Sequence, residues 1–174
     1  GGPYAGCIRS IQSTEVSAIL EGGTTGTAFH ERTAPLNRKL AWREWSGYFA
    51  ASLYHDSVDI EYNAIREAVA LIDVSPLYKY LVRGPDATRL VDRVITRDAS
   101  RVPAGRVIYT PWCDEDGKVV DDGTLAHLDD GSWRWTAADP QLRWLRQNAH
   151  GLDVQVDEIT DDVAALALQG PRAR

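Results

Sequence analysis

Residues 109–128, YTPWCDEDGKVVDDGTLAHL, contain two strand-like runs on either side of a short polar turn. The longer runs RVIYTPWC and KVVDDGTLAHL flank the turn DEDG, in which Gly117 is free to adopt a positive φ. This pattern predicts a β-hairpin. Its second strand carries two adjacent carboxylates, Asp121 and Asp122, although charged side chains are depleted from strands.

The two carboxylates point in opposite directions, because side chains alternate between the faces of a strand. In one interpretation both carboxylates are solvated at a solvent-exposed end of the hairpin, and Gly123 marks a β-bulge. In the other, one Asp faces a pocket and hydrogen-bonds a nitrogen-rich ligand or acts as an acid or base. The aromatic residues of the neighbouring strands fit either a pocket wall or a core: Tyr109, Trp112, Trp133 and Trp135.

The segments on both sides of the hairpin predict further helices and strands. The spacing of apolar residues, together with Gly and Pro at the boundaries, predicts helices over 62–69, 85–96 and 139–151 and strands over 77–84, 131–138, 152–160 and 163–170. For the first helix, Ser57 or Asp59 is the expected N-cap and LIDVSPL the expected end. For the third helix, Asp139 is the expected N-cap. Helices interspersed with hairpin-connected strands indicate an α+β fold. We expect the helices to pack on one face of a mainly antiparallel sheet.

The composition of the chain argues against several classes of protein function. The chain has 174 residues, 44% of them hydrophobic and 25% charged, as in an ordinary globular protein. A net charge of -6 argues against nucleic acid as a partner, and no apolar run approaches the roughly 18 residues that span a membrane. Cys7 and Cys113 lie far apart and belong to no metal-binding motif, which favours two free thiols in a reducing cytoplasm and no metal site.

The two ends of the chain predict its domain organisation. Residues 1–28 are rich in Gly, Ser and Thr and are interpreted as a flexible leader or tail, which leaves 29–174 as the folded region. The chain has no methionine, and it stops directly after an apolar run and a Gly-Pro turn. We therefore expect an incomplete or processed chain.

Three segments together resemble one family, the glycine-cleavage T-proteins, which are tetrahydrofolate-dependent aminomethyltransferases. IREAVALIDVSPLYKYLVRGPDA (65–87) is similar to the family pattern R…GLFDVSHM…V.G.DA. IYTPWCDEDGKVVDDGTLAHL (108–128) resembles Y…N..GG..DDL.V, and VAALALQGPRA (163–173) resembles A.QGP.A. The order and spacing of all three agree from Ile65 to Ala173.

The resemblance implies a fold, a cofactor and a site. It implies the N-terminal part of the folate-binding T-protein fold and tetrahydrofolate as cofactor. Asp122, the second Asp of the pair, would be the catalytic residue beside the pteridine, and Asp121 its outward, solvated neighbour. Tyr109 would pack on the folate, and Leu77 and Thr136 would also contact the cofactor.

The departures from the family pattern lie around these same positions. Pro76 and Leu77 replace the His and Met of DVSHM, Gly123 replaces the apolar residue of DDL, and Thr136 replaces the Asn of V.NA. They favour a paralogue, such as an O-, S- or N-demethylase that passes a methyl or methylene group to tetrahydrofolate. The expected partners are a small-molecule one-carbon donor and, for aminomethyl transfer, a lipoyl carrier protein.

Two alternatives remain open at this point. One is a folate-binding accessory protein for iron-sulfur cluster repair, and the other is the folate-binding part of a sarcosine or dimethylglycine dehydrogenase. In every case we expect local folding from Glu61 to Ala149. We do not expect this chain to complete the folate site or to be active by itself.

Overall fold

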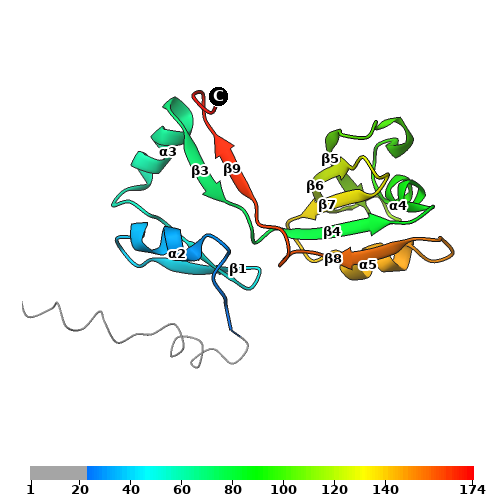
Figure 1. Ribbon diagram of the computed structural model, residues 1–174, viewed down its shortest axis with the longest axis horizontal. Helices are drawn as coiled ribbons and strands as arrows, with labels where there is room; N and C mark the ends of the chain where they lie inside the picture. Colours follow the sequence, from blue (N-terminus) through cyan, green and yellow to red (C-terminus); the bar gives the residue numbers. More distant parts are fainter. Residues whose placement is uncertain (1–22) are drawn as a thin grey trace, which may run out of the picture. The chain divides into compact units, whose positions relative to one another are not determined.

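The computed structural model describes residues 23–174, which form two compact units (Figure 1). Unit 1 comprises the described residues up to Pro76 together with Ala167–Arg174, and unit 2 is Leu77–Leu166. Most of the predicted leader, residues 1–22, lies outside the described residues. Its last part belongs to unit 1, because Thr25 N–H donates to the Gly47 carbonyl (2.9 Å) and Thr27 Oγ1 donates to Asp73 (2.6 Å).

Unit 1 is built from short elements around two two-stranded sheets, β1-β2 and β3-β9. Its elements are α2 (His30–Thr33), the 3-10 turn η1 (Ala34–Leu36), β1 (Trp42–Trp45), β2 (Tyr48–Ala51), α3 (Val58–Glu67), β3 (Ala70–Asp73) and β9 (Leu166–Gln169). The β1-β2 hairpin was not predicted. Its turn contains two residues with a positive φ, Ser46 at 51° and Gly47 at 83°. The alternation of apolar and polar side chains is weak because both strands have only four residues.

Helix α3 confirms the predicted cap and corrects the predicted end. The Ser57 side chain accepts from Asp59 N–H (3.3 Å), so Ser57 is the N-cap. The helix ends at Glu67, before the expected LIDVSPL, and the following residues form strand β3. The Ala68 carbonyl accepts from Arg172 N–H (2.9 Å), so pairing with the distant end of the chain replaces another helical turn.

Unit 2 contains a five-stranded antiparallel sheet with the order β5-β6-β7-β4-β8. Its elements are β4 (Tyr78–Arg83), α4 (Ala87–Val94), the 3-10 turn η2 (Ala99–Arg101), β5 (Val107–Cys113), β6 (Val119–His127), β7 (Trp133–Ala137), α5 (Leu142–Asn148) and β8 (Gln155–Glu158). The β5-β6 hairpin is confirmed, and Gly117 takes φ 78° in its turn. The pairing of β5 with β6 shifts by one residue between Trp112 and Cys113, and Val120 of β6 has no partner there. The prediction of a β-bulge at Gly123 is therefore wrong.

One face of this sheet packs against α4 and α5 and forms the core of unit 2. Leu90, Val91 and Val94 of α4 and Leu145 of α5 join the buried side chains of the strands, Tyr80, Val82, Trp112, Leu125, Trp133 and Trp135. The α+β prediction with helices on one face is therefore confirmed. Helix α5 begins at Leu142 with Gln141 at the N-cap, so the predicted cap at Asp139 is wrong.

Gly123 lies where β6 and β7 approach each other closely. A Cβ added at this position would lie 2.0 Å from the Thr136 carbonyl oxygen and 3.1 Å from its carbon. Both atoms belong to the backbone of β7 and are held by the ladder, so they have little freedom to move aside. The absence of a side chain at residue 123 therefore sets the spacing of the two strands.

We predict that Gly123→Ala lowers the free energy of unfolding by about 2 kcal/mol or more, because the new methyl group overlaps the β7 backbone. Urea unfolding followed by tryptophan fluorescence measures the change. Thr124→Ala, at the exposed neighbouring position of β6, is the matched control and should change stability by less than about 0.5 kcal/mol. Equal stability of the two variants would show that the strands separate without cost.

Candidate functional site

The face of the sheet opposite α4 and α5 carries the predicted site residues Tyr109, Asp122 and Thr136. Directly paired residues on neighbouring strands share a face, and Tyr109 pairs with Thr124, which in turn pairs with Thr136. Asp122 lies two residues before Thr124 on β6 and therefore on the same face. We call this surface the open face, defined by Tyr109, Asp122, Thr124 and Thr136.

Tyr109 and Asp122 form a direct contact on the open face. The Tyr109 hydroxyl donates a short hydrogen bond to Asp122 Oδ2. Both side chains are exposed, and Tyr109 retains 58% of its accessible surface. This hydrogen bond to the carboxylate, together with desolvation, raises the pKa of Tyr109 above its usual value. The phenol therefore stays protonated at neutral pH and remains a donor.

Leu77 lies immediately before β4, two positions before Lys79, which ends the same cross-strand row. Lys79 pairs with Thr136, and its ammonium group donates to the Leu77 carbonyl (2.8 Å). Lys79 is almost fully buried, whereas the Leu77 side chain is half-buried. The structure thus brings the backbone of Leu77 next to the row that contains Thr136 and Tyr109.

Asp121 is buried, so the expectation of an outward, solvated side chain is wrong. Only 9% of its surface is accessible. Its Oδ1 accepts from Asp122 N–H (2.7 Å), and its Oδ2 accepts from Asp139 N–H (3.1 Å) and from Gln141 Nε2 (3.3 Å). Asp121 shares its face with Leu125, and this apolar neighbour was the sequence signal that it points inward.

Gln141 extends the Asp121 contacts into a buried polar network that sequence reasoning missed. Its Oε1 accepts from Trp112 Nε1 (3.3 Å), and its backbone N–H donates to the Tyr80 hydroxyl (2.8 Å). Burial raises the pKa of Tyr80 to about 12, so this hydroxyl is neutral at physiological pH. No local motif marks Gln141, because all three of its partners lie far from it in the sequence.

The open face presents one carboxylate and one aromatic ring to solvent. The Asp122 carboxylate accepts hydrogen bonds, and the exposed Tyr109 ring offers a flat apolar surface beside it. These groups fit a flat heterocycle that has N–H donors at its edge. Within residues 23–174, no three His, Cys, Asp or Glu side chains are grouped to hold a metal ion.

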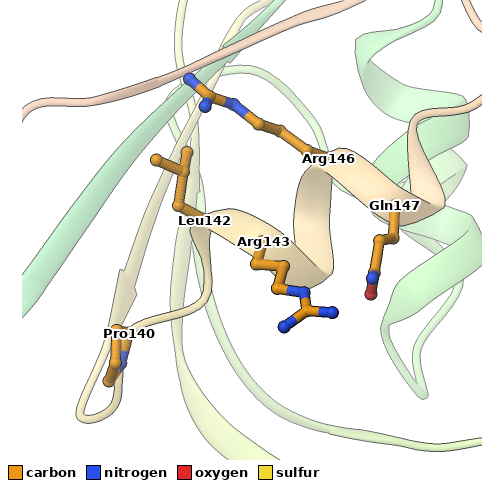
Figure 2. Close-up of a pocket in the computed structure, with 5 residues that line it drawn as sticks. All are labelled: Pro140, Leu142, Arg143, Arg146 and Gln147. Carbon is orange, nitrogen blue, oxygen red and sulfur yellow. The ribbon is translucent and has the colours of Figure 1, made fainter.

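A hollow of unit 2 lies elsewhere, over helix α5 (Figure 2). It has a volume of about 660 Å³ and is lined by Pro140, Leu142, Arg143, Arg146 and Gln147. Figure 2 shows the Arg143 and Arg146 side chains extending in different directions from the helix. None of the predicted site residues lines this hollow. We place the candidate site on the open face, because the exposed carboxylate and ring lie there.

Two further findings concern the cysteines and membranes. Cys113 is a free, half-buried thiol, whereas Cys7 lies outside the described residues. Among residues 23–174 there is no helix with the length and apolar character needed to cross a bilayer.

The family described as the GCVT N-terminal domain matches residues 27–174. The chain is 37% identical over 134 residues to an aminomethyltransferase of Moorella thermoacetica, covering 75% of this chain and 36% of that protein. It is 32% identical over 152 residues to an aminomethyltransferase of Thermotoga maritima (85% and 41%). It is also 35% identical over 155 residues to a trimethylamine-oxide aldolase of Ruegeria pomeroyi (87% and 19%).

A solved structure gives the same fold. Glycine cleavage system aminomethyltransferase T from Bartonella henselae superposes with a TM-score of 0.70 at 24% identity, over 83% of this chain and 40% of that one. The chain therefore spans less than half the length of these relatives.

We predict that Asp121→Ala lowers the free energy of unfolding by about 3 kcal/mol, because it leaves the buried donors of Asp122, Asp139 and Gln141 without an acceptor. Urea unfolding measures the loss. Asp129→Ala removes an exposed carboxylate close by and should change stability by less than about 0.5 kcal/mol. Similar values for both variants would place Asp121 outside the stabilising network.

We predict that Tyr109 titrates above the usual tyrosine range and that Asp122→Asn lowers its pKa, since the hydrogen bond to the carboxylate is the main cause of the shift. The difference in phenolate absorbance between the parent chain and Tyr109→Phe isolates this group. Asp129→Asn should leave the titration unchanged. An unaltered Tyr109 pKa in Asp122→Asn would contradict the paired geometry.

Proposed function

Since the chain belongs to the aminomethyltransferase family, as its N-terminal portion, we propose that its open face binds tetrahydrofolate during a one-carbon transfer. The observation that carries this proposal is the Tyr109–Asp122 pair on a sheet face that also presents Thr136. The aminomethyltransferase names of the relatives support the class of reaction. The activity of the 174-residue chain by itself is not part of the proposal.

Each residue has a distinct role in the proposed site. Tetrahydrofolate, when bound, supplies the ring nitrogens that take up the one-carbon group. The Asp122 carboxylate accepts hydrogen bonds from the ligand edge and stabilises positive charge that develops beside it. The Tyr109 ring packs against the heterocycle, while its neutral hydroxyl holds Asp122 in one orientation. The Thr136 hydroxyl supplies a further polar contact on the same face.

The proposal for the one-carbon donor is supported by the departures from the family sequence pattern and by the name of one relative. Leu77, Gly123 and Thr136 of unit 2 differ from the family pattern, and the Ruegeria pomeroyi relative is named a trimethylamine-oxide aldolase. These observations favour an N-methylated amine as the small-molecule donor. The second candidate is an aminomethyl group carried by a lipoyl protein, which the names of the aminomethyltransferase relatives favour.

We predict that Asp122→Asn in the intact gene product that contains this chain lowers the transfer rate at least about 100-fold, because a neutral amide stabilises developing positive charge poorly. Formation of the one-carbon folate product is measured separately with an N-methylated amine and with an aminomethyl-loaded lipoyl carrier. The donor that supports turnover in the parent protein identifies the reaction.

The Asp122→Asn protein must also keep its fold. Its urea midpoint should stay close to that of the parent protein, because Asp122 is exposed and its side chain is isosteric with Asn. Asp129→Asn is the charge-matched control and should retain full turnover. Full turnover in Asp122→Asn as well would remove Asp122 from the mechanism.

A further inference from the structure

Arg134 lies on the open face, one residue pair away from the proposed site. It precedes Thr136 by two positions on β7, so both side chains project from the same face. Its direct partners across the sheet are Leu81 of β4 and Ala126 of β6. Its side chain is exposed, whereas the flanking Trp133 and Trp135 are buried on the other face.

The guanidinium group of Arg134 has no counter-charge within the described part of the chain. Two strand carboxylates share this face, and both are engaged elsewhere. Asp122 accepts from Tyr109, and Asp157 forms an ion pair with Arg83 (2.7 Å). No hydrogen bond or ion pair of the Arg134 side chain occurs among residues 23–174, although the whole chain carries a net charge of -6.

Exposed apolar side chains lie on the edge strand β5, beside the carboxylate of β6 and the guanidinium group of β7. Val107 pairs with Ala126, which pairs with Arg134, so Val107 belongs to the Arg134 row. Val107 is 62% exposed and Tyr109 is 58% exposed, although both are large apolar side chains. From ordinary strand spacing, the Cα atoms of Tyr109 and Arg134 are about 12 Å apart. The open face thus offers an acceptor on β6, an unpaired cation on β7, and apolar side chains on the edge strand β5 beside them.

This arrangement matches an elongated ligand with a donor-rich ring and an anionic end. We propose that Arg134 binds a carboxylate of the ligand that Asp122 and Tyr109 hold, an inference that rests on the proposed function. A planar guanidinium group binds a carboxylate through two parallel hydrogen bonds. The carboxylate belongs either to the glutamate tail of tetrahydrofolate or to a carboxylated amine donor. Arg134 is then a specificity residue rather than a catalytic one.

The test compares Arg134→Gln with the parent in the intact gene product. The probes are tetrahydrofolate with one glutamate, tetrahydrofolate with three glutamates, and 6-methyltetrahydropterin, which has no tail. We expect calorimetric titration to show that Arg134→Gln weakens binding of both folates by about tenfold and leaves the pterin unchanged. Arg134→Lys should restore part of the loss, because it keeps the charge but not the bidentate geometry.

Matched controls separate this inference from the proposed function. Arg106→Gln removes one charge from an exposed position just outside β5 and should leave every affinity unchanged. A rise in KM confined to carboxylated donors in Arg134→Gln would support the inference with the donor as the source. Unchanged affinities and KM values in Arg134→Gln would overturn it and leave the proposed function intact. If the parent protein binds neither folate nor pterin, the proposed function fails and this inference fails with it.

Discussion

The buried carboxylate of Asp121 joins the β5-β6 hairpin to the connection between β7 and α5. Its two oxygens accept from the backbone of Asp122, the backbone of Asp139 and the amide of Gln141. A buried charge is tolerated only when such donors satisfy it. Because one of these donors is the N–H of Asp122, the contact that satisfies the core also fixes the backbone from which the site carboxylate projects. The inward Asp thereby determines where the outward Asp lies.

One face of the unit 2 sheet forms the hydrophobic core, and the other carries the candidate site. The helix-covered face holds Trp112, Trp133 and Trp135, whose burial contributes much of the hydrophobic stabilisation of this unit. The open face holds the exposed Tyr109 and Asp122, which add little to stability and are free to bind a ligand. Strand alternation connects the two faces, so a slip of one residue would exchange core and site side chains.

The sequence predicted local features well and distant contacts poorly. The hairpin, the Ser57 cap and the opposite directions of Asp121 and Asp122 follow from turn chemistry and alternation, which act over a few residues. The solvated reading of Asp121 failed because its partners Asp139 and Gln141 come from a different connection. For the same reason α5 starts later than its Asp-Pro signal suggested, since Asp139 N–H donates to Asp121 and Gln141 N–H donates to Tyr80. In unit 1, β3 replaced a predicted helix end because its partner β9 lies at the far end of the chain.

The strand order β5-β6-β7-β4-β8 also has a consequence for the order in which the chain folds. Strands β5, β6 and β7 are consecutive and pair locally, but β4 lies between β7 and β8, which both follow it in the sequence. Lys79 N–H at the start of β4 donates to Thr160, 81 residues later. Such pairings of high sequence separation form late. During synthesis, β4 is therefore made before either of its partners. It stays unpaired until β7 has been made at residue 137, and its second edge stays unpaired until the chain extends past residue 158.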